Sequence, residues 1–366
     1  MLRPLGRNIS KTWGHNTYFI DTFIDLFVEK ILDLLSPLLE TGAQFFTWLD
    51  AGKTFGLVSS VIGAANPWQL LALFLVSSLL MIWRLNVIET KGFEGTVIGT
   101  LVMPYCSGFA NLAFAYVMAT TGGKAEMVLE NCLVNNVTNL TLLLGIPALF
   151  WGMNLYRKKA RKPTEKIAHL SLTLTLIAML FFSAITWLLA RDGGLHRTDG
   201  LVLIGLFLFW QLFQIFEVMK SNIRKRRSIS KWIFFDLGLV IAAALGTYYS
   251  IEGLVGWVSD GGGGFVSYSY LGVVSGLLMV IPNGMLAFYY SAIGRSDIAY
   301  SSQIGDAHIC IPMCIGIYAL FSPMDIPASF ETGIWILLGA IIAHLVFLGS
   351  LGRLPRVAGA LLAGSY

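Results

Sequence analysis

Four asparagines within one apolar stretch of the chain are the first residues whose chemistry needs an explanation. The stretch from Glu130 to Phe150 is otherwise hydrophobic enough to lie inside a membrane. An amide side chain in hydrocarbon is costly unless protein, water or an ion satisfies it, so these side chains face the protein interior. There they either hold helices together or surround a polar substrate, and we expect a substrate site near the middle of the membrane. The four residues are Asn131, Asn135, Asn136 and Asn139, of which the first, second and fourth share one helix face.

Asp306 is the second candidate, because it is a carboxylate within another predicted membrane span. Placing an ionisable group inside a membrane costs at least about 2.5 kcal/mol on insertion scales, and such residues commonly serve ion or proton pathways. The alternative is a protonated or amide-paired aspartate that only ties helices together. His308, two residues further on, lies on a different helix face and is interpreted as a packing residue, with a proton relay as the alternative.

The composition predicts an all-α polytopic membrane protein. Hydrophobic residues make up 56% of the 366 residues and charged residues only 13%, and long apolar runs recur. The sequence has no Gly-rich phosphate loop, zinc-ligand spacing or serine–histidine–acid arrangement, so we do not expect an enzyme. The net charge of +4 comes largely from two short loops, which indicates membrane orientation and not nucleic-acid binding. The four cysteines fall inside predicted spans and are interpreted as small buried hydrophobes: Cys106, Cys132, Cys310 and Cys314.

The apolar runs predict nine membrane spans, with a tenth as the alternative. The nine lie near residues 66–84, 94–120, 126–152, 168–190, 199–219, 231–250, 267–292, 300–321 and 329–350. Before them, residues 18–39 have apolar and charged faces at helical spacing, which predicts an amphipathic helix on the membrane or against a partner protein. Residues 42–64 are interpreted as a surface hairpin, because Asp50 and Lys53 interrupt them, with a short span as the alternative.

Two short sequence matches indicate an internal duplication. Residues 145–150 read GIPALF and residues 316–321 read GIYALF, an offset of 171. Upstream, residues 112–116 read LAFAY and residues 286–290 read LAFYY, an offset of 174. The same order and similar offsets predict a duplicated helix pair, with chance similarity between apolar helices as the alternative.

Two basic loops set the predicted orientation of the spans. Residues 157–166 and 220–231 are rich in lysine and arginine and are separated by two spans, so both are expected on the cytoplasmic side of a bacterial inner membrane. The two copies of the helix pair then cross the membrane in opposite senses. Inverted repeats with broken helices are typical of secondary transporters, which bind substrate near the bilayer midplane. The residues expected to break the second and seventh spans are Gly99, Pro104, Gly108, Pro282 and Gly284.

These features divide the chain into five segments. They are an N-terminal amphipathic segment (1–64), a first repeat half (65–219), a basic linker (220–230), a second repeat half (231–350) and a C-terminal tail (351–366). In this division the fifth span of the first half has no partner in the second.

The stretch from Asn131 to Gly145 resembles the first signature repeat of the sodium/calcium exchanger (cation/calcium antiporter) superfamily, whose pattern is roughly GNxxGSNxxNxxxxLG. The residues that match it in place are Asn131, Asn136, Asn139 and Gly145, and Asn135 stands at the family's serine. In the second half, Gly305-Asp306-Ala307 resembles the family's GSN step, which puts Asp306 at the serine and Cys310 at the later polar position.

The family's glutamates are the main departure. Gly99, Thr100 and Pro104 are similar to the family's GTSxPE motif, but Tyr105 stands where the glutamate belongs. The helix-pair spacing puts Asn111 or Leu112 there instead. In the second half Pro282 precedes Asn283, which replaces the other glutamate.

The resemblance implies a membrane antiporter with a cation site between the two halves. A site with one carboxylate and several amides suits Na⁺ or H⁺ better than Ca²⁺, and no other cofactor is expected. The expected partners are the lipid bilayer and a small inorganic cation, without nucleic acid. The alternative is a transporter-derived subunit that no longer moves ions and scaffolds a membrane complex through residues 18–64. The candidate ion-binding residues are Asn111, Asn135, Asn136, Asn139, Asn283, Asp306, Glu130 and Cys310.

Overall fold

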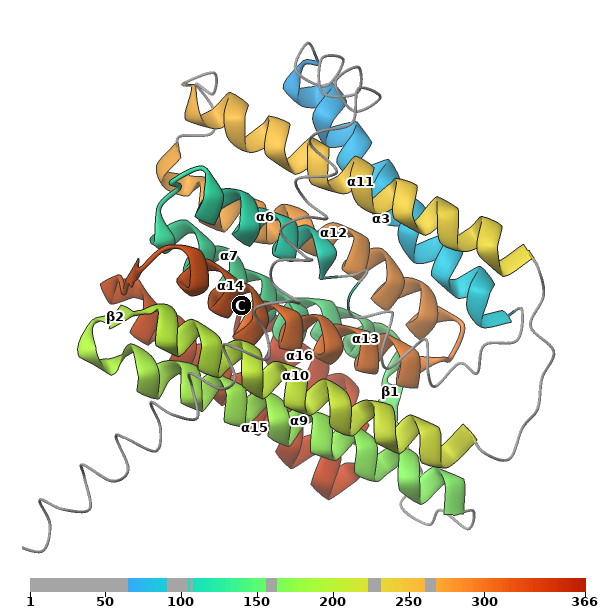
Figure 1. The fold of residues 1–366 in the computed structure, drawn as a ribbon. Coiled ribbons are helices and arrows are strands. Elements are labelled where there is room, and N and C mark those ends of the chain that lie inside the picture. The colour runs from blue at the N-terminus through green and yellow to red at the C-terminus, as the bar shows by residue number, and fades with distance from the viewer. Residues whose placement is uncertain (1–64, 91–104, 106–107, 156–162, 223–231, 261–267) are drawn as a thin grey trace, which may run out of the picture. The chain divides into compact units, whose positions relative to one another are not determined.

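The computed structural model describes residues 65–90, 105, 108–155, 163–222, 232–260 and 268–366 (Figure 1). The predicted amphipathic helix 18–39 and hairpin 42–64 lie outside the described residues. So do Gly99, Thr100, Pro104 and most of the two basic loops.

The described residues form a helical membrane bundle. Eight of their helical segments are long and apolar enough to cross a membrane, in agreement with eight of the nine predicted spans. The uninterrupted ones are α3 (Pro67–Thr90), α9 (Pro163–Leu189), α10 (Arg197–Asn222), α11 (Trp232–Ser259), α12 (Leu271–Ala292) and α15 (Ala328–Leu351). In the second predicted span, the described part is the shorter helix α6 (Phe109–Thr120).

Two of the membrane helices are interrupted at their middles. The first consists of α7 (Ala125–Thr138), the π-helix η2 (Asn139–Leu143) and α8 (Leu144–Trp151). The second consists of α13 (Ser296–His308), the π-helix η5 (Ile309–Cys314) and α14 (Ile315–Phe321). In η5, Ile311 has φ −128° and ψ 112°, outside the helical region, directly before Pro312. We call these two segments the broken helices.

The positions of the breaks correct the prediction from the sequence. Helix α12 runs without interruption through Pro282 and Gly284, so the seventh span does not break there. Gly108 lies directly before α6, and a Cβ atom on it would lie 2.7 Å from the Ile309 side chain, so this glycine allows a close approach of the second broken helix. The described breaks are in the third and eighth spans.

Short strands show that the two halves are inverted. β1 (Met153–Asn154), after the first broken helix, pairs antiparallel with β4 (Arg353–Leu354), and β2 (Gly194–Leu195) pairs with β3 (Met324–Asp325), after the second broken helix. β1 and β2 lie at opposite ends of α9, whose 27 residues span about 40 Å (Figure 1). The two broken helices therefore end at opposite sides of the bundle and run in opposite senses.

The C-terminal residues form a helix rather than the predicted tail. Helix α16 (Arg356–Gly364) buries Ala358 and Leu362 and packs on α8, just as α10 packs on α14. Gly359 of α16 approaches the backbone of α8 at Gly145, and Gly200 of α10 approaches α14 at Gly316. Because Gly145 and Gly316 are 171 residues apart, the two contacts are equivalent, and α16 is the counterpart of α10.

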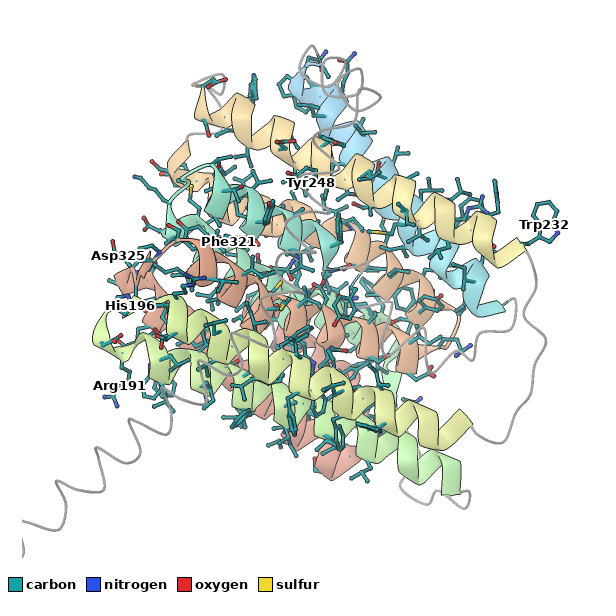
Figure 2. All side chains as sticks on the ribbon, in the orientation of Figure 1. Arg191, His196, Trp232, Tyr248, Phe321 and Asp325 are labelled. Atoms are coloured by element: carbon teal, nitrogen blue, oxygen red, sulfur yellow. The ribbon has the colours of Figure 1, made fainter. Side chains whose placement is uncertain are left out.

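The distribution of side chains fits a bilayer. Large apolar side chains such as Phe209 and Val346 point outward, with 71% and 58% of their surfaces exposed. Polar and charged residues gather at the helix ends, as Arg191, His196 and Asp325 do near β2 (Figure 2). The chain is an integral membrane protein, and its buried interior is where the broken helices meet.

Candidate functional site

The site lies where the two broken helices cross. Asn139, the first residue of η2, donates hydrogen bonds from Nδ2 to Asp306 Oδ2 at 2.7 Å and to Asn135 Oδ1 at 2.9 Å. Cys310, the second residue of η5, donates from Sγ to the same Asn135 oxygen at 3.4 Å. These contacts join the four side chains into one connected cluster, which we call the crossing cluster. All four residues are fully buried.

The crossing cluster follows the symmetry of the repeat. Asn135 and Asp306 are 171 residues apart, and so are Asn139 and Cys310. The bond from Asn139 to Asp306 therefore has its equivalent in the bond from Cys310 to Asn135. Asn136 donates from Nδ2 to the carbonyl oxygen of Ala307 at 3.1 Å, and this pair is also 171 residues apart. The local twofold axis of the two halves thus passes through the cluster.

Asp306 is the central ionisable group of the cluster. It is completely buried near the middle of a 26-residue membrane segment. A carboxylate at this depth is strongly disfavoured as a bare charge, and a bound cation or proton stabilises it in addition to its hydrogen bonds. The arrangement can therefore hold a positive charge at mid-membrane.

Further amide oxygens are available close to the cluster. The side-chain oxygens of Asn136, Asn139 and Asn283 are buried and have no hydrogen-bond donor among the described residues. Buried acceptors are rarely left in this state, because each loses its hydrogen bonds to water. Amide oxygens are suitable ligands for a small inorganic cation, so this finding fits a cation as substrate.

Gln303 is a residue that the interpretation of the sequence missed. It is fully buried on α13 and donates from Nε2 to the backbone oxygen of Asn283 at 3.1 Å, while its Oε1 has no donor in the described part of the chain. The sequence contained a signal for Gln303, because its amide lies inside a predicted apolar span. The asparagines were identified as candidates by the same rule.

Asn111 extends the cluster towards α6. Its Oδ1 accepts a hydrogen bond from Asn135 Nδ2 at 3.4 Å, and the residue is fully buried. The structure therefore brings Asn111 together with Asn135, Asn139, Asp306 and Cys310.

Two residues of the Glu130 to Phe150 stretch turn away from the crossing cluster. Asn131 donates to Ser275 Oγ at 2.9 Å and to Met279 Sδ at 3.4 Å, so it faces α12. Glu130 is only partly buried and lies close to Gly272 in the first turn of α12. No described contact connects Glu130 with Asp306. The row of asparagines on the first broken helix therefore divides, with Asn131 in a helix contact and Asn135 and Asn139 in the cluster.

A buried histidine supports the break in the first broken helix. His344 of α15 donates from Nε2 to the carbonyl oxygen of Leu140 at 2.8 Å, and its Nδ1 accepts from Tyr300 at 3.0 Å. Leu140 directly follows Asn139, and a π-helix leaves carbonyl groups without their regular helical partners. His308 bonds through Nε2 to the Thr175 carbonyl oxygen at 3.0 Å.

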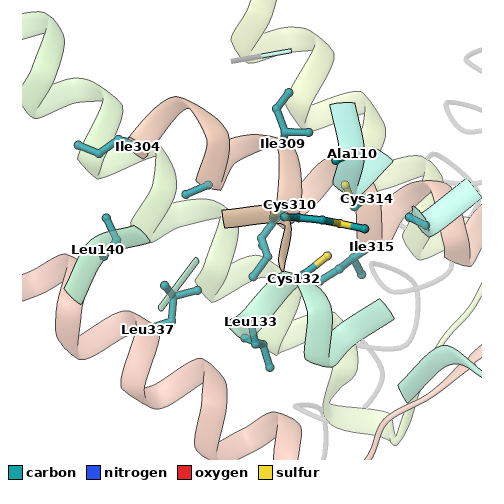
Figure 3. Packing of buried hydrophobic residues seen from close by; sticks show 14 of the residues in the cluster. Ala110, Cys132, Leu133, Leu140, Ile304, Ile309, Cys310, Cys314, Ile315 and Leu337 are labelled. Carbon is teal, nitrogen blue, oxygen red and sulfur yellow. The ribbon is translucent and has the colours of Figure 1, made fainter. Parts of the chain in front are cut away.

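The cysteines beside the cluster are reduced and buried. Cys132, Cys310 and Cys314 gather among apolar side chains such as Ile309 and Ile315 (Figure 3). Among the residues that the structure describes, no three histidine, cysteine or acidic residues are arranged to hold a metal ion. The cluster therefore offers one carboxylate, two amides and one thiol to a substrate.

Part of the chain, which includes Asn135 and Asn139, matches a known family. Residues 69–216 match the sodium/calcium exchanger protein family. No curated protein sequence matches the chain. The structure of the sodium-calcium exchanger NCX_Mj soaked with 2.5 mM Na⁺ and 1 mM Sr²⁺ is similar, with a TM-score of 0.63 at 16% identity over 84% of this chain and 96% of that chain. The structure soaked with 10 mM Na⁺ and zero Ca²⁺ gives a TM-score of 0.62 at 15% identity, over 84% of this chain and 97% of that chain.

The matched family is one of membrane exchangers, and the structural likeness extends over both halves of the bundle, including the inverted repeat. Residues 69–216 thus match the sodium/calcium exchanger protein family, and the chain as a whole has the fold of NCX_Mj.

Proposed function

We propose that the protein is an alternating-access cation antiporter that binds a monovalent cation or a proton at Asp306. The observation that carries this proposal is the position of Asp306, which is buried at the crossing of two inverted broken helices and bonded to Asn139. In transporters built from inverted repeats, this crossing is where the substrate binds and where access alternates between the two sides of the membrane.

The charge of the crossing cluster favours a monovalent substrate. The other members of the cluster are Asn135, Asn139 and Cys310, which are two amides and a thiol. One carboxylate balances one positive charge, so a bound Na⁺ or H⁺ leaves the buried site electrically neutral. Calcium prefers six to eight oxygen ligands that include carboxylates, and it would leave a net positive charge in this apolar interior.

The unbonded amide oxygens of Asn136, Asn139 and Asn283 supply the remaining ligands in this proposal. Neutral oxygen ligands suit hard monovalent cations, and they let an ion leave again because they do not bind it too tightly. We further propose that the basic loops 157–166 and 220–231 face the cytoplasm, as the positive-inside rule expects.

The test is transport in proteoliposomes that contain the full chain. Imposed gradients of Na⁺, K⁺ and Ca²⁺ are each combined with a pH-sensitive dye inside the vesicles. We expect flux of a monovalent cation, with or without counter-movement of protons, and little flux of Ca²⁺.

Asp306→Asn should abolish that flux while the protein stays folded, because the amide keeps the shape and removes the charge. The matched control is Asp297→Asn, since Asp297 is on the same helix but exposed and paired with Arg295 at 3.5 Å. Undiminished flux in Asp306→Asn would remove this residue from the mechanism. A folded protein that moves none of the ions would instead support a non-transporting subunit of a membrane complex.

A further inference from the structure

An apolar cavity of about 270 Å³ lies away from the crossing cluster, between α3, α6, α11 and α12. It is considerably larger than the engineered cavity of about 150 Å³ that binds benzene in a well-studied soluble protein. Its lining residues are Pro67, Trp68, Leu71, Phe74, Phe114, Ile251, Leu254, Val255, Trp257, Val258, Leu271, Val274, Ser275, Leu278 and Met279.

The cavity lies at a loose helix contact. Helix α11 packs closely on α6 and on α3, whereas α3 meets α12 at few positions. The cavity occupies this looser contact.

The lining is unsuited to water. Its polar side chain is Ser275, whose Oγ already donates to the Gly272 carbonyl oxygen at 2.9 Å and accepts from Asn131 at 2.9 Å. A buried water needs two to four polar partners, which this lining does not supply. The chemistry of the cavity therefore selects an apolar occupant.

The surroundings of the cavity identify that occupant. Three of its four helices are membrane-spanning, and lining residues such as Val274 and Trp68 also form part of the exposed apolar surface, with 38% and 78% exposed. The cavity is thus continuous with the surface that faces the lipid. Trp68 is the second residue of α3 and Trp257 the third from the end of α11, and tryptophans at helix ends commonly lie at the level of the lipid headgroups.

We propose that this cavity binds one acyl chain of a membrane phospholipid. The tryptophans Trp68 and Trp257 lie beside the headgroup region, and the chain extends along Leu71 and Leu278 between α3 and α12. The far side of the same wall is held by Asn131 of the first broken helix through Ser275 and Met279. The bound acyl chain therefore lies between the α3–α11 pair and α12, the helix that contacts Asn131 of the first broken helix.

The experiment uses the full chain, purified in detergent and depleted of lipid. A phosphatidylcholine with a diazirine in the middle of one acyl chain is added at increasing concentration, and after irradiation the labelled residues are identified by mass spectrometry. We expect saturable labelling of α3, α11 and α12 at cavity residues, and non-saturable labelling of outward-facing residues such as Phe209.

Filling the cavity should remove the saturable labelling. Val255→Phe and Val274→Phe each place a ring in the volume that the chain would occupy. Each should lower the saturable labelling by at least about tenfold, the loss expected when two or so methylene groups are no longer buried. The control is Val202→Phe, since Val202 lies on α10, far from the cavity in sequence, and is 38% exposed. All variants are first shown to elute as monodisperse protein.

Two results would overturn the proposal. One is equal labelling of cavity residues in the parent protein and in both filled variants. The other is labelling of the cavity by a free photoactivatable fatty acid but not by the phospholipid, which would assign the site to a different ligand. Neither result depends on transport, so the outcome is independent of the proposed antiport.

Discussion

Asn139 Nδ2 lies 2.7 Å from Asp306 Oδ2, and this bond joins the first broken helix to the second at the centre of the membrane. The same amide group also donates to Asn135, so one side chain orients both acceptors. If the crossing cluster is the ion site, the bond fixes the carboxylate in the position where it binds the ion.

Replacing this amide should separate transport from stability. Asn139→Leu keeps the approximate size of the side chain and removes its hydrogen bonds, so we expect flux to fall at least about tenfold. Interhelical hydrogen bonds in membrane proteins contribute only about 0.6 kcal/mol on average, so the thermal midpoint should fall only slightly. Asn131→Leu is the matched control on the same helix, and flux measurements should show it near the parent level. Equal loss of flux in both variants would contradict the division of the asparagine row.

The inverted arrangement can be tested by cross-linking the short strands. Met153→Cys with Leu354→Cys, and Leu195→Cys with Met324→Cys, place cysteines at directly paired positions. Directly opposite residues of antiparallel strands lie at Cα distances compatible with a disulfide. With a protease site inserted within residues 223–231, oxidised protein should stay as one band on a gel after cleavage, and reduced protein should give two.

The control for cross-linking combines one residue from each strand pair. Met153→Cys with Met324→Cys joins positions at opposite ends of the bundle, so no intramolecular cross-link is expected. Efficient cross-linking of this pair would show that the two broken helices end on the same side, and the inverted repeat would be abandoned.

The close contact of α10 with α14 predicts a sharp difference between two glycines on one helix. A Cβ atom on Gly200 would lie 2.7 Å from the Gly316 oxygen and 2.8 Å from the Leu320 nitrogen, whereas one on Gly205 would have nothing within 4 Å. Gly200→Ala should therefore lower the thermal midpoint, because both neighbours are backbone atoms that cannot move aside. Gly205→Ala should raise it slightly, since alanine is favoured over glycine in a helix by up to about 1 kcal/mol. The thermal midpoints of the two variants are measured in the same detergent. Equal midpoints would show that α10 and α14 lie further apart than the structure describes.

His344 should act through the backbone of the first broken helix. His344→Leu removes the donor to the Leu140 carbonyl oxygen. Interhelical hydrogen bonds in membrane proteins contribute about 0.6 kcal/mol on average and up to about 1.7 kcal/mol, so a measurable loss of stability is expected. Tyr300→Phe removes only the outer bond of the pair and should cost less. The three thermal midpoints, measured in detergent, should therefore decrease in the order parent, Tyr300→Phe, His344→Leu. A larger loss in Tyr300→Phe would reverse the assigned roles.

Much of the fold could be predicted from the sequence, because membrane insertion imposes a simple rule. Each span needs about 20 apolar residues, and eight of the nine predicted spans coincide with helices that satisfy it. The offset of 171 between GIPALF and GIYALF also identified the equivalence that β1, β3 and the paired glycines display. Of the predicted site, Asn135, Asn139 and Asp306 come together directly.

The remainder depends on contacts between residues that are distant in the sequence. Pro282 and Gly284 predicted a break in α12, but the helix continues, because a proline or glycine inside a membrane helix is tolerated where its surroundings satisfy the backbone. The break at Asn139 has no such sequence signal, and the donor that bonds the next carbonyl, His344, is 204 residues from Leu140. Helix α16 was missed because nine residues are too few to register as a span.

Several contacts between the halves occur twice, with the roles of the halves exchanged. β1 pairs with β4 as β3 pairs with β2, and α16 packs on α8 as α10 packs on α14. A polypeptide of one half alone, inserted into the bilayer in both directions, would satisfy every one of these contacts with a second copy of itself. When two such copies are fused into one chain, the sequence of each half can change independently. Only then can an acid at position 306 lie opposite an amide at the equivalent position 135, since two identical copies carry the same residue at both.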